Sequence, residues 1–455
     1  MILKSNRWNN QVLLNIQLTK SQDIFLIYKN SKEAFSFWKN IHISQRLLYI
    51  SNFLNIYKTK RNEIANSITI EIGKPITQAL ADVDYDIWYI ERFVDNAKKI
   101  LADEVICDSN KNKHIIKYDP IWVMAVISPR NYPTSQRVRQ IIPTLIAGNT
   151  VIYKCSSSCM RTANILNQIL KSVLPKDVFS EIYGDSKLGD KLIKWNCDAI
   201  IFTGSTKIWL HIAKIAAIHI KKTFLELGWS APAVICKDAM IDDNMMHSFD
   251  YYRRRHGWQI CDGIKRLIIH RDKFDEFMIK MSKHLNNKKI WNPLDPKTDI
   301  WPLISQNQKD ILLSQIQDAK DKWAKIIQLG KYDNTPWAFV LPTLITDVSL
   351  DMQIMTEETF GPILPIYIYD NISEAINIAN STIYGLGGYI WSDNSDDIDK
   401  LIIWLNTWNI SINNAAYLLP EVPFWWYTVN SGNTRAHGKI WLRELCKIKT
   451  ISLSN

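Results

Sequence analysis

The chain has 455 residues, of which 47% are hydrophobic and 22% charged, and it carries a formal net charge of +10. This length and composition predict a folded protein of two or three domains and exclude a disordered chain. The lysines are spread along the chain rather than gathered into a basic stripe, which disfavours nucleic acid as a partner. No apolar run reaches about 18 residues and the first residues lack a signal-peptide core. We therefore expect no membrane partner and, by default, a cytoplasmic location.

The cysteine pattern argues against both disulfides and zinc. The seven cysteines are an odd number and show no C-x-x-C spacing, whereas zinc sites and disulfide frameworks use paired, regularly spaced cysteines. The sequence therefore predicts reduced thiols and no metal site.

The first hundred residues read as mainly helical. Apolar residues recur at three- and four-residue spacing in 43–57 and 78–99, which is typical of amphipathic helices. A polar interruption at 108–113, followed by a strand-like run at 114–118, predicts a β-hairpin.

From about residue 120 the chain alternates short β-branched runs with helical segments, which indicates parallel βαβ units with binding groups at the strand ends. We expect strands at 123–127, 150–154, 179–183, 199–202 and 223–227. We expect helices after residue 133, at 163–173 and from 206. A second alternating region runs from 232 to about 414, with helices at 273–285 and 307–325.

Three residues suggest acyl chemistry. Cys261 supplies a thiol, Glu226 a carboxylate and Asn131 an amide donor. A thiolate can add to a carbonyl, donors can hold the resulting oxyanion, and a base can activate the water that completes the reaction. Taken alone, a single cysteine is more often a buried apolar side chain, and a strand-end carboxylate can simply pair with a lysine.

Short segments in a fixed order carry a resemblance that covers nearly the whole chain. Their order makes chance agreement very unlikely. The segments are 71–75 (Glu-Ile-Gly-Lys-Pro), 147–151 (Ala-Gly-Asn-Thr-Val), 202–206 (Phe-Thr-Gly-Ser-Thr), 225–228 (Leu-Glu-Leu-Gly), 257–261 (Gly-Trp-Gln-Ile-Cys) and 357–362 (Glu-Glu-Thr-Phe-Gly-Pro). The chain resembles the aldehyde dehydrogenase superfamily and is most similar to the NAD(P)-dependent succinate-semialdehyde dehydrogenases.

The resemblance implies an α/β fold with a Rossmann-type cofactor domain, a second α/β catalytic domain and a β oligomerisation arm. The expected boundaries are 1–107 with 123–226 for the cofactor domain, 227–423 for the catalytic domain, and 108–122 with 424–455 for the arm and C-terminal segment. A homodimer or homotetramer built through the arm is expected.

The resemblance also assigns catalytic roles. Cys261 is expected to attack the aldehyde carbon, and the Asn131 side chain together with the Cys261 backbone N–H is expected to hold the oxyanion. After hydride passes to the nicotinamide, Glu226 is expected to activate the water that hydrolyses the thioester on Cys261.

For the cofactor, Gly204 and Ser205 end a strand and open a helix, where backbone N–H groups and the helix dipole favour a pyrophosphate. The resemblance places Lys154 at the adenosine ribose, Glu358 at the nicotinamide ribose and Phe360 near the nicotinamide. Many NAD-preferring members carry a glutamate where this chain has Ser157, which removes a charge that would repel a 2′-phosphate. The cofactor is thus NAD or NADP, with a slight preference for NADP or dual use.

Two arginines bear on the substrate, a small-molecule aldehyde. Arg139 and Arg255 match positions at which succinate-semialdehyde dehydrogenases carry arginine for the remote carboxylate, and a guanidinium binds carboxylate bidentately. The alternative is that both belong to a basic surface, because Arg137, Arg253 and Arg254 are close by in sequence.

Tryptophan stands at positions where the family pattern has glycine. A bulky residue at a position of positive φ costs about 1–3 kcal/mol, and eight such costs would sum to about 8–24 kcal/mol. A genome that reads UGA as glycine, decoded with a table that reads it as tryptophan, would produce this pattern. The positions are Trp122, Trp209, Trp229, Trp258, Trp301, Trp408, Trp425 and Trp426.

The leading hypothesis is an NAD(P)-dependent aldehyde dehydrogenase that oxidises succinate semialdehyde to succinate. Two alternatives stay open. One is a broad-specificity aldehyde dehydrogenase. The other is a catalytically inactive nucleotide-binding oligomer of the same fold, which the tryptophans would favour if they are real.

Overall fold

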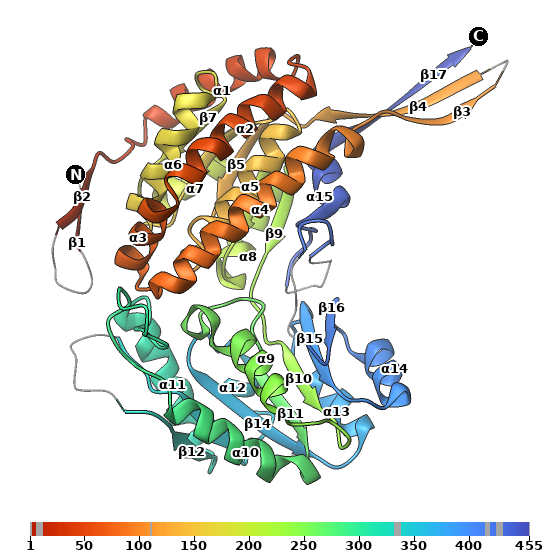
Figure 1. The fold of residues 1–455 in the computed structure, drawn as a ribbon. Helices are drawn as coiled ribbons and strands as arrows, with labels where there is room; N and C mark the ends of the chain where they lie inside the picture. The colour runs from red at the N-terminus through yellow and green to blue at the C-terminus, as the bar shows by residue number, and fades with distance from the viewer. Residues whose placement is uncertain are drawn as a thin grey trace.

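The computed structural model describes residues 2–5, 12–109, 112–331, 338–414, 419–424 and 431–454. These residues form two α/β lobes and a projecting three-stranded arm (Figure 1).

The first lobe is built on a parallel sheet whose strands are buried on both faces, as their β-branched runs predict. The strand order is β7-β6-β5-β8-β9. The strands are β5 (Val123–Ile127), β6 (Thr150–Lys154), β7 (Phe179–Ile182), β8 (Ala199–Thr203) and β9 (Lys222–Glu226). The crossover helices are α5 (Ser135–Ile146), α6 (Met160–Val173), α7 (Ser186–Lys194) and α8 (Thr206–Ile218). The chain reverses its direction across the sheet between β5 and β8, which is where α/β folds bind ligands.

Four N-terminal helices complete this lobe, and Figure 1 shows α2 and α4 crossing the front of the sheet. The helices are α1 (Asp23–Trp38), α2 (Ile43–Thr59), α3 (Arg61–Ile72) and α4 (Ile76–Ile100), preceded by an antiparallel pair β1 (Ile2–Ser5) and β2 (Val12–Ile16). Their apolar faces share one large core with α5 and α6, as the sequence periodicity indicates.

The second lobe holds a seven-stranded sheet in the order β12-β13-β14-β11-β10-β15-β16, with β12 antiparallel to its neighbour. The strands are β10 (Pro232–Ile235), β11 (Arg266–His270), β12 (Lys325–Gln328), β13 (Thr343–Thr346), β14 (Ile363–Tyr369), β15 (Gly387–Trp391) and β16 (Asn409–Ile412). The helices are α9 (Asp243–Arg254), η1 (Arg255–Trp258), α10 (Arg271–Asn286), α11 (Gln306–Asp321), α12 (Gln353–Thr356), α13 (Ile372–Ala379) and α14 (Ser395–Trp404). The expectation that a helix continues to residue 325 is wrong, because Lys322 caps α11 and Trp323 turns the chain with φ +69°.

The arm consists of β3 (Glu104–Asp108), β4 (Asn112–Pro120) and β17 (Cys446–Ser454) in the order β17-β4-β3, and α15 (Gly438–Glu444) leads into it. Its strands extend away from the two lobes (Figure 1). The predicted hairpin is present, but β3 already pairs at Glu104 with Ile116, so the arm starts four residues before the expected boundary at 108. No helix in the described part of the chain is long and apolar enough to cross a membrane.

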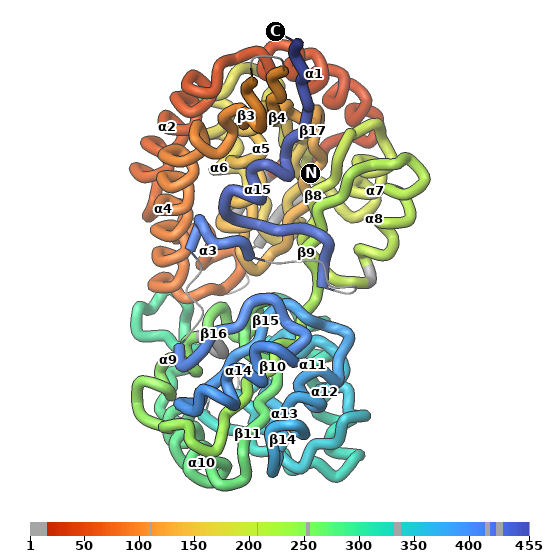
Figure 2. Tube along the Cα trace, turned by 90° about the vertical axis from the view of Figure 1, so that its right-hand side faces the viewer, coloured from red at the N-terminus to blue at the C-terminus, as the bar shows by residue number. Residues whose placement is uncertain are grey.

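The two lobes are joined by the chain that leaves β9. Figure 2 shows β9 running toward the second lobe, whose strand β10 follows in sequence. Glu226 is the last residue of β9. The strand that carries the predicted base therefore ends at the junction of the lobes.

Candidate active site

Cys261 and Glu226 come together at this junction although they lie 35 residues apart. The Cys261 Sγ donates toward Glu226 Oε1 at 3.7 Å, so the carboxylate contacts the sulfur directly. Cys261 follows η1 in the second lobe and Glu226 ends β9 of the first lobe. The contact thus depends on how the two lobes are packed.

The Glu226 carboxylate is buried in a hydrogen-bond network. Thr203 Oγ1 donates to its Oε2 at 2.8 Å, and Gln136 Nε2 donates to its Oε1 at 3.2 Å. Burial raises the pKa of Glu226 to about 8, against the opposing effect of the Thr203 hydrogen bond. Glu226 can therefore exchange a proton near neutral pH, as a general base requires.

The surroundings of Cys261 disfavour its thiolate form. Burial raises the pKa of the Cys261 thiol well above the ordinary range, and the nearby carboxylates of Glu226 and Asp262 raise it further. A thiolate at this position would therefore need a nearby base to accept its proton. Glu226 is the carboxylate in contact with the sulfur.

Asn131 lies in the loop after β5 and reaches the segment that carries Cys261. Its Nδ2 donates to the backbone carbonyl of Gln259 at 3.0 Å. The amide predicted to hold the oxyanion therefore contacts Gln259, which lies two residues before Cys261.

Four of the residues expected at the cofactor lie at or after the carboxyl ends of strands in the first sheet. Gly204 follows β8, and Ser205 is the N-cap of α8 but makes no side-chain capping bond. Lys154 ends β6, its Nζ donates to its neighbour Cys155, and burial lowers its pKa. Ser157 is exposed, and no bulk at that position blocks a phosphate.

Gly228 lies close to both the start of α8 and Glu358. A Cβ placed on Gly228 would lie 3.0 Å from Glu358 Oε2 and 3.3 Å from Thr206 Oγ1, so a side chain there would crowd both groups. Burial raises the pKa of Glu358 to about 7. The Phe360 ring stacks under Lys265, whose Nζ lies 4.9 Å from the ring centroid. The uncapped start of α8 is suited to a pyrophosphate, and the Glu358 carboxylate is suited to ribose hydroxyls, so the two groups fit a dinucleotide.

The arginines named above lie in different surroundings. Arg139 is 6% exposed, lies 4.9 Å from the Tyr85 ring centroid, and its positive charge acts on both Glu226 and Cys261. Arg255 is half-buried and donates to Tyr132 Oη at 2.9 Å from Nη2. Arg137 is buried in an ion pair with Glu181 at 2.9 Å. Neither Arg137 nor Arg139 therefore belongs to a basic surface.

Positive φ, and with it backbone strain, is found at only one of the described tryptophans that stand at family glycine positions. Of Trp122, Trp209, Trp229, Trp258, Trp301 and Trp408, which lie in the described part of the chain, Trp258 alone has positive φ, at +61°. The expected strain at each of the other five is wrong, because their backbone is of ordinary conformation. Trp425 and Trp426 lie outside the described residues.

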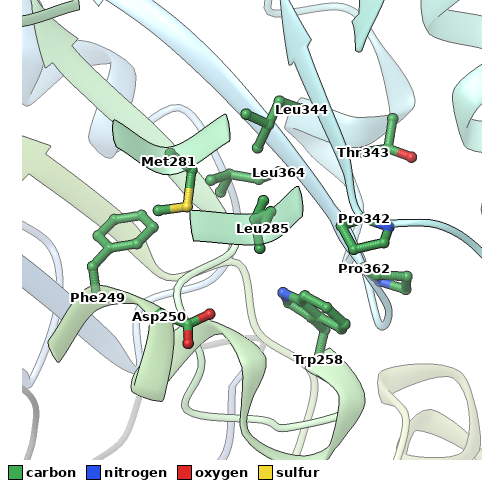
Figure 3. A pocket seen from close by; sticks show the side chains of 10 residues that line it. All are labelled: Phe249, Asp250, Trp258, Met281, Leu285, Pro342, Thr343, Leu344, Pro362 and Leu364. Carbon is green, nitrogen blue, oxygen red and sulfur yellow. The ribbon is translucent and has the colours of Figure 1, made fainter. Parts of the chain in front are cut away.

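The Trp258 ring is accommodated in the core of the second lobe. Figure 3 shows it among Leu285, Pro342 and the other side chains that line a pocket, which come from α9, α10, β13, β14 and the chain before these strands. The residue is 4% exposed. Its strain therefore amounts to the backbone cost of one residue, about 1–3 kcal/mol, and not to a disrupted lobe.

Trp323 offers a clean measurement of such strain. It has φ +69° after α11 and is 92% exposed, so its ring gains little from burial. Glycine is the preferred residue at a left-handed position after a helix. We expect Trp323→Gly to raise the free energy of unfolding by about 1 kcal/mol and Trp323→Ala, which keeps a Cβ, to raise it by less than about 0.5 kcal/mol. Urea unfolding measures both, and equal effects of glycine and alanine would contradict the strain.

The sequence did not predict several side chains of this site. Thr203 and Gln136 bind the Glu226 carboxylate, and His256 contacts the Asn131 backbone. Thr203 lies in segment 202–206, which carries the resemblance, and Gln136 lies in the helix after Asn131. The sequence therefore shows that both residues lie near predicted site residues. Their contact with Glu226 depends on packing between β8, β9 and α5, which local sequence does not report.

Known proteins are similar to this chain over nearly its full length. A family model described as "Aldehyde dehydrogenase family" matches residues 2–451. A protein named succinate-semialdehyde dehydrogenase (NADP+) from Mycobacterium avium is 29% identical over 439 residues, covering 95% of this chain and 90% of that protein. One from Mycobacterium tuberculosis with the same name, numbered 1, is 30% identical over 425 residues, covering 92% of each.

Solved structures show the same fold. The succinic semialdehyde dehydrogenase of Streptococcus pyogenes, in complex with NADP+, matches with a TM-score of 0.94 and 26% identity, covering 100% of both chains. An E. coli NADP-dependent enzyme matches with a TM-score of 0.95 and 26% identity, covering 100% of this chain and 95% of that one. The chain belongs to the aldehyde dehydrogenase family. The predicted fold class is confirmed.

Proposed function

We propose that this protein oxidises succinate semialdehyde to succinate with NADP+ or NAD+, with NADP+ preferred. The contact between Cys261 Sγ and Glu226 Oε1 carries the proposal, because it joins a thiol to a carboxylate whose pKa is raised to about 8, near the range in which a general base works. The curated relatives named for this substrate and for NADP+, and the exposed Ser157 that leaves room for a 2′-phosphate, support the substrate and the cofactor.

The proposed mechanism begins when the aldehyde carbonyl reaches Cys261. The Sγ–H proton passes to Glu226, sulfur bonds to the carbonyl carbon, and the oxyanion accepts hydrogen bonds from the Asn131 amide and the Cys261 backbone N–H. The nicotinamide, when bound, supplies the two-electron oxidation that turns the thiohemiacetal into a thioester. Glu226 passes the Sγ proton to solvent and then, as the carboxylate, takes a proton from water while the water oxygen attacks the thioester carbon. The C–S bond breaks to release the acid, and the leaving sulfur regains a proton from Glu226.

The cofactor would be held by residues from both lobes. The backbone N–H groups after Gly204 and Ser205 would face the pyrophosphate, Lys154 the adenosine ribose, and Glu358 the nicotinamide ribose. Phe360 would lie beside the nicotinamide. Gly228 lies between the start of α8 and Glu358, where a Cβ would crowd both.

The two arginines provide a test of the substrate. Arg139 and Arg255 are proposed to bind the remote carboxylate, and loss of a charged hydrogen bond costs about 1.5–3 kcal/mol. We expect Arg139→Leu and Arg255→Leu each to lower kcat/KM for succinate semialdehyde by about 10- to 100-fold. The matched neutral substrate is butanal, which has the same four-carbon length. Its kcat/KM should change by less than about threefold in Arg255→Leu, and in Arg139→Leu by a smaller factor than that for succinate semialdehyde, because the Arg139 charge also acts on Glu226 and Cys261. Equal losses on both aldehydes would favour a broad-specificity enzyme instead.

The arm is proposed to join copies of the chain into a homodimer or homotetramer. Its outer strands carry exposed apolar side chains, among them Val105, Ile106, Ile448 and Leu453. Such side chains on a projecting sheet are typical of an interaction surface. Light scattering of the intact chain and of one truncated before β17 distinguishes an oligomer that depends on the arm from a monomer.

A further inference from the structure

A buried cluster of three ionisable side chains lies behind Asn131. Lys74 Nζ donates to Asp82 Oδ2 and lies 2.9 Å from His256 Nε2, which is itself 3.3 Å from Asp82 Oδ1. Lys74, Asp82 and His256 are 1%, 7% and 2% exposed. Burying such groups is costly unless each is paired, so the cluster depends on all three contacts.

His256 links this cluster to the oxyanion amide. Its Nδ1 lies 3.0 Å from the Asn131 carbonyl oxygen, and its ring packs on Tyr132 at a centroid separation of 3.5 Å. Its backbone N–H donates to Gln78 Oε1 at 3.1 Å. The residue sits at φ +58° and ψ +28°, a left-handed conformation that few side chains adopt, so the surroundings hold it there.

The partners determine the tautomer. The Asn131 carbonyl can only accept, so Nδ1 carries the hydrogen and donates it. Nε2 lies between the Lys74 Nζ and the Asp82 carboxylate, so it either accepts from a lysine ammonium or, in an imidazolium beside a neutral lysine, donates to the carboxylate. In both arrangements one cation and one carboxylate leave no net charge among the three side chains, which keeps the desolvation cost low.

Asn131 is consequently held at both of its polar ends by one short segment. His256 binds its backbone carbonyl, and Gln259 accepts from its side-chain Nδ2 at 3.0 Å. The same segment leads directly to Cys261. A shift of Asn131 of about 1 Å would misplace an oxyanion donor, and such displacements cost about 100-fold in rate.

We infer that His256 is a positioning residue, which holds Asn131 against the nucleophile segment through its Nδ1–H and is itself fixed by the buried Lys74–Asp82 pair. This inference rests on the proposed function, since it concerns the oxyanion of the same reaction. His256 touches neither substrate nor cofactor and acts through Asn131.

Two variants of similar size separate the two ends of the imidazole. The amide of His256→Asn places its N–H where Nδ1 lies, and asparagine tolerates positive φ. The amide of His256→Gln reaches the Nε2 position and leaves the Asn131 carbonyl without a donor. We expect kcat within about threefold of the parent for His256→Asn and a loss of about 10- to 100-fold for His256→Gln. If thermal unfolding shows that His256→Gln is not folded, His256→Ala replaces it as the variant without a donor.

The readouts are NADP+ reduction with succinate semialdehyde and release of nitrophenolate from 4-nitrophenyl acetate, which acylates the thiol without cofactor or aldehyde. In an Asn131→Ala background the His256→Gln change should cost less than about threefold, and the dissociation constant for NADP+ should stay within twofold. Three results would overturn the positioning role. The losses of His256→Gln and Asn131→Ala could multiply in the double variant, His256→Asn and His256→Gln could have equal rates, or NADP+ binding could weaken in parallel with activity. If the parent protein is inactive on both substrates, the proposed function is overturned together with this inference. If the parent is active and the kcat of His256→Gln equals that of the parent, this inference alone is overturned.

Discussion

Replacing Cys261 with alanine is expected to lower kcat for aldehyde oxidation by about 10⁴-fold or more, because removal of the nucleophile removes the covalent route entirely. The loss should appear equally in NADP+ reduction and in 4-nitrophenyl acetate hydrolysis, since both would begin with attack by Sγ. Binding of NADP+ should persist, because Cys261 is not among the residues proposed to hold the dinucleotide.

A buried cysteine away from this site gives the control. Cys236 follows β10, is 1% exposed, and lies in the core of the second lobe. Cys236→Ala should cost a little stability and leave kcat within about twofold. Retained turnover in the Cys261→Ala protein would show that another group attacks the carbonyl.

Glu226→Gln is expected to lower kcat by about 10²- to 10⁴-fold, the range of a lost general base. The reason is that glutamine is close in shape but cannot accept a proton from the thiol or from water. After rapid mixing with 4-nitrophenyl acetate, the slow steady release that reports thioester hydrolysis should be nearly absent.

The pH dependence of the parent protein follows from the same residue. Burial raises the pKa of Glu226 to about 8, and only the carboxylate form acts as a base. The active fraction therefore increases as the pH rises through 8, by about 50-fold between pH 6 and pH 8. The Thr203 hydrogen bond favours the carboxylate, so Thr203→Val should move this rise to higher pH. A flat profile, or a profile unchanged in Thr203→Val, would argue against Glu226 as the base.

Local sequence pattern predicted the first lobe closely. The expected strands at 123–127 and 150–154 match β5 and β6 residue for residue. These strands are short, apolar and bounded by turn residues, so local preference and tertiary packing agree. The segments of the resemblance also lie at strand ends, where Gly204 and Glu226 face the junction of the lobes.

Prediction failed where packing or an unexpected residue type decides the outcome. The end of α11 was missed because Trp323 occupies a left-handed turn that glycine normally marks. The burial of Arg139 and the cluster around His256 arise from α4, α5 and the segment before Cys261, which are far apart in sequence. Trp258 and Trp323 at positive φ agree with the hypothesis of UGA codons read as glycine. UGG codons at Trp209, Trp258 and Trp425 would rule it out.

The most direct test of the account is reduction of NADP+ at neutral to mildly alkaline pH with succinate semialdehyde, measured on the chain as written and on a chain with glycine at the eight tryptophan positions. Each is paired with its Cys261→Ala variant. The account predicts one reduced cofactor per succinate formed, abolished by Cys261→Ala, with higher activity in the glycine chain. Folded proteins that bind NADP+ but reduce it in neither form would contradict the account and would favour a non-catalytic, nucleotide-binding oligomer.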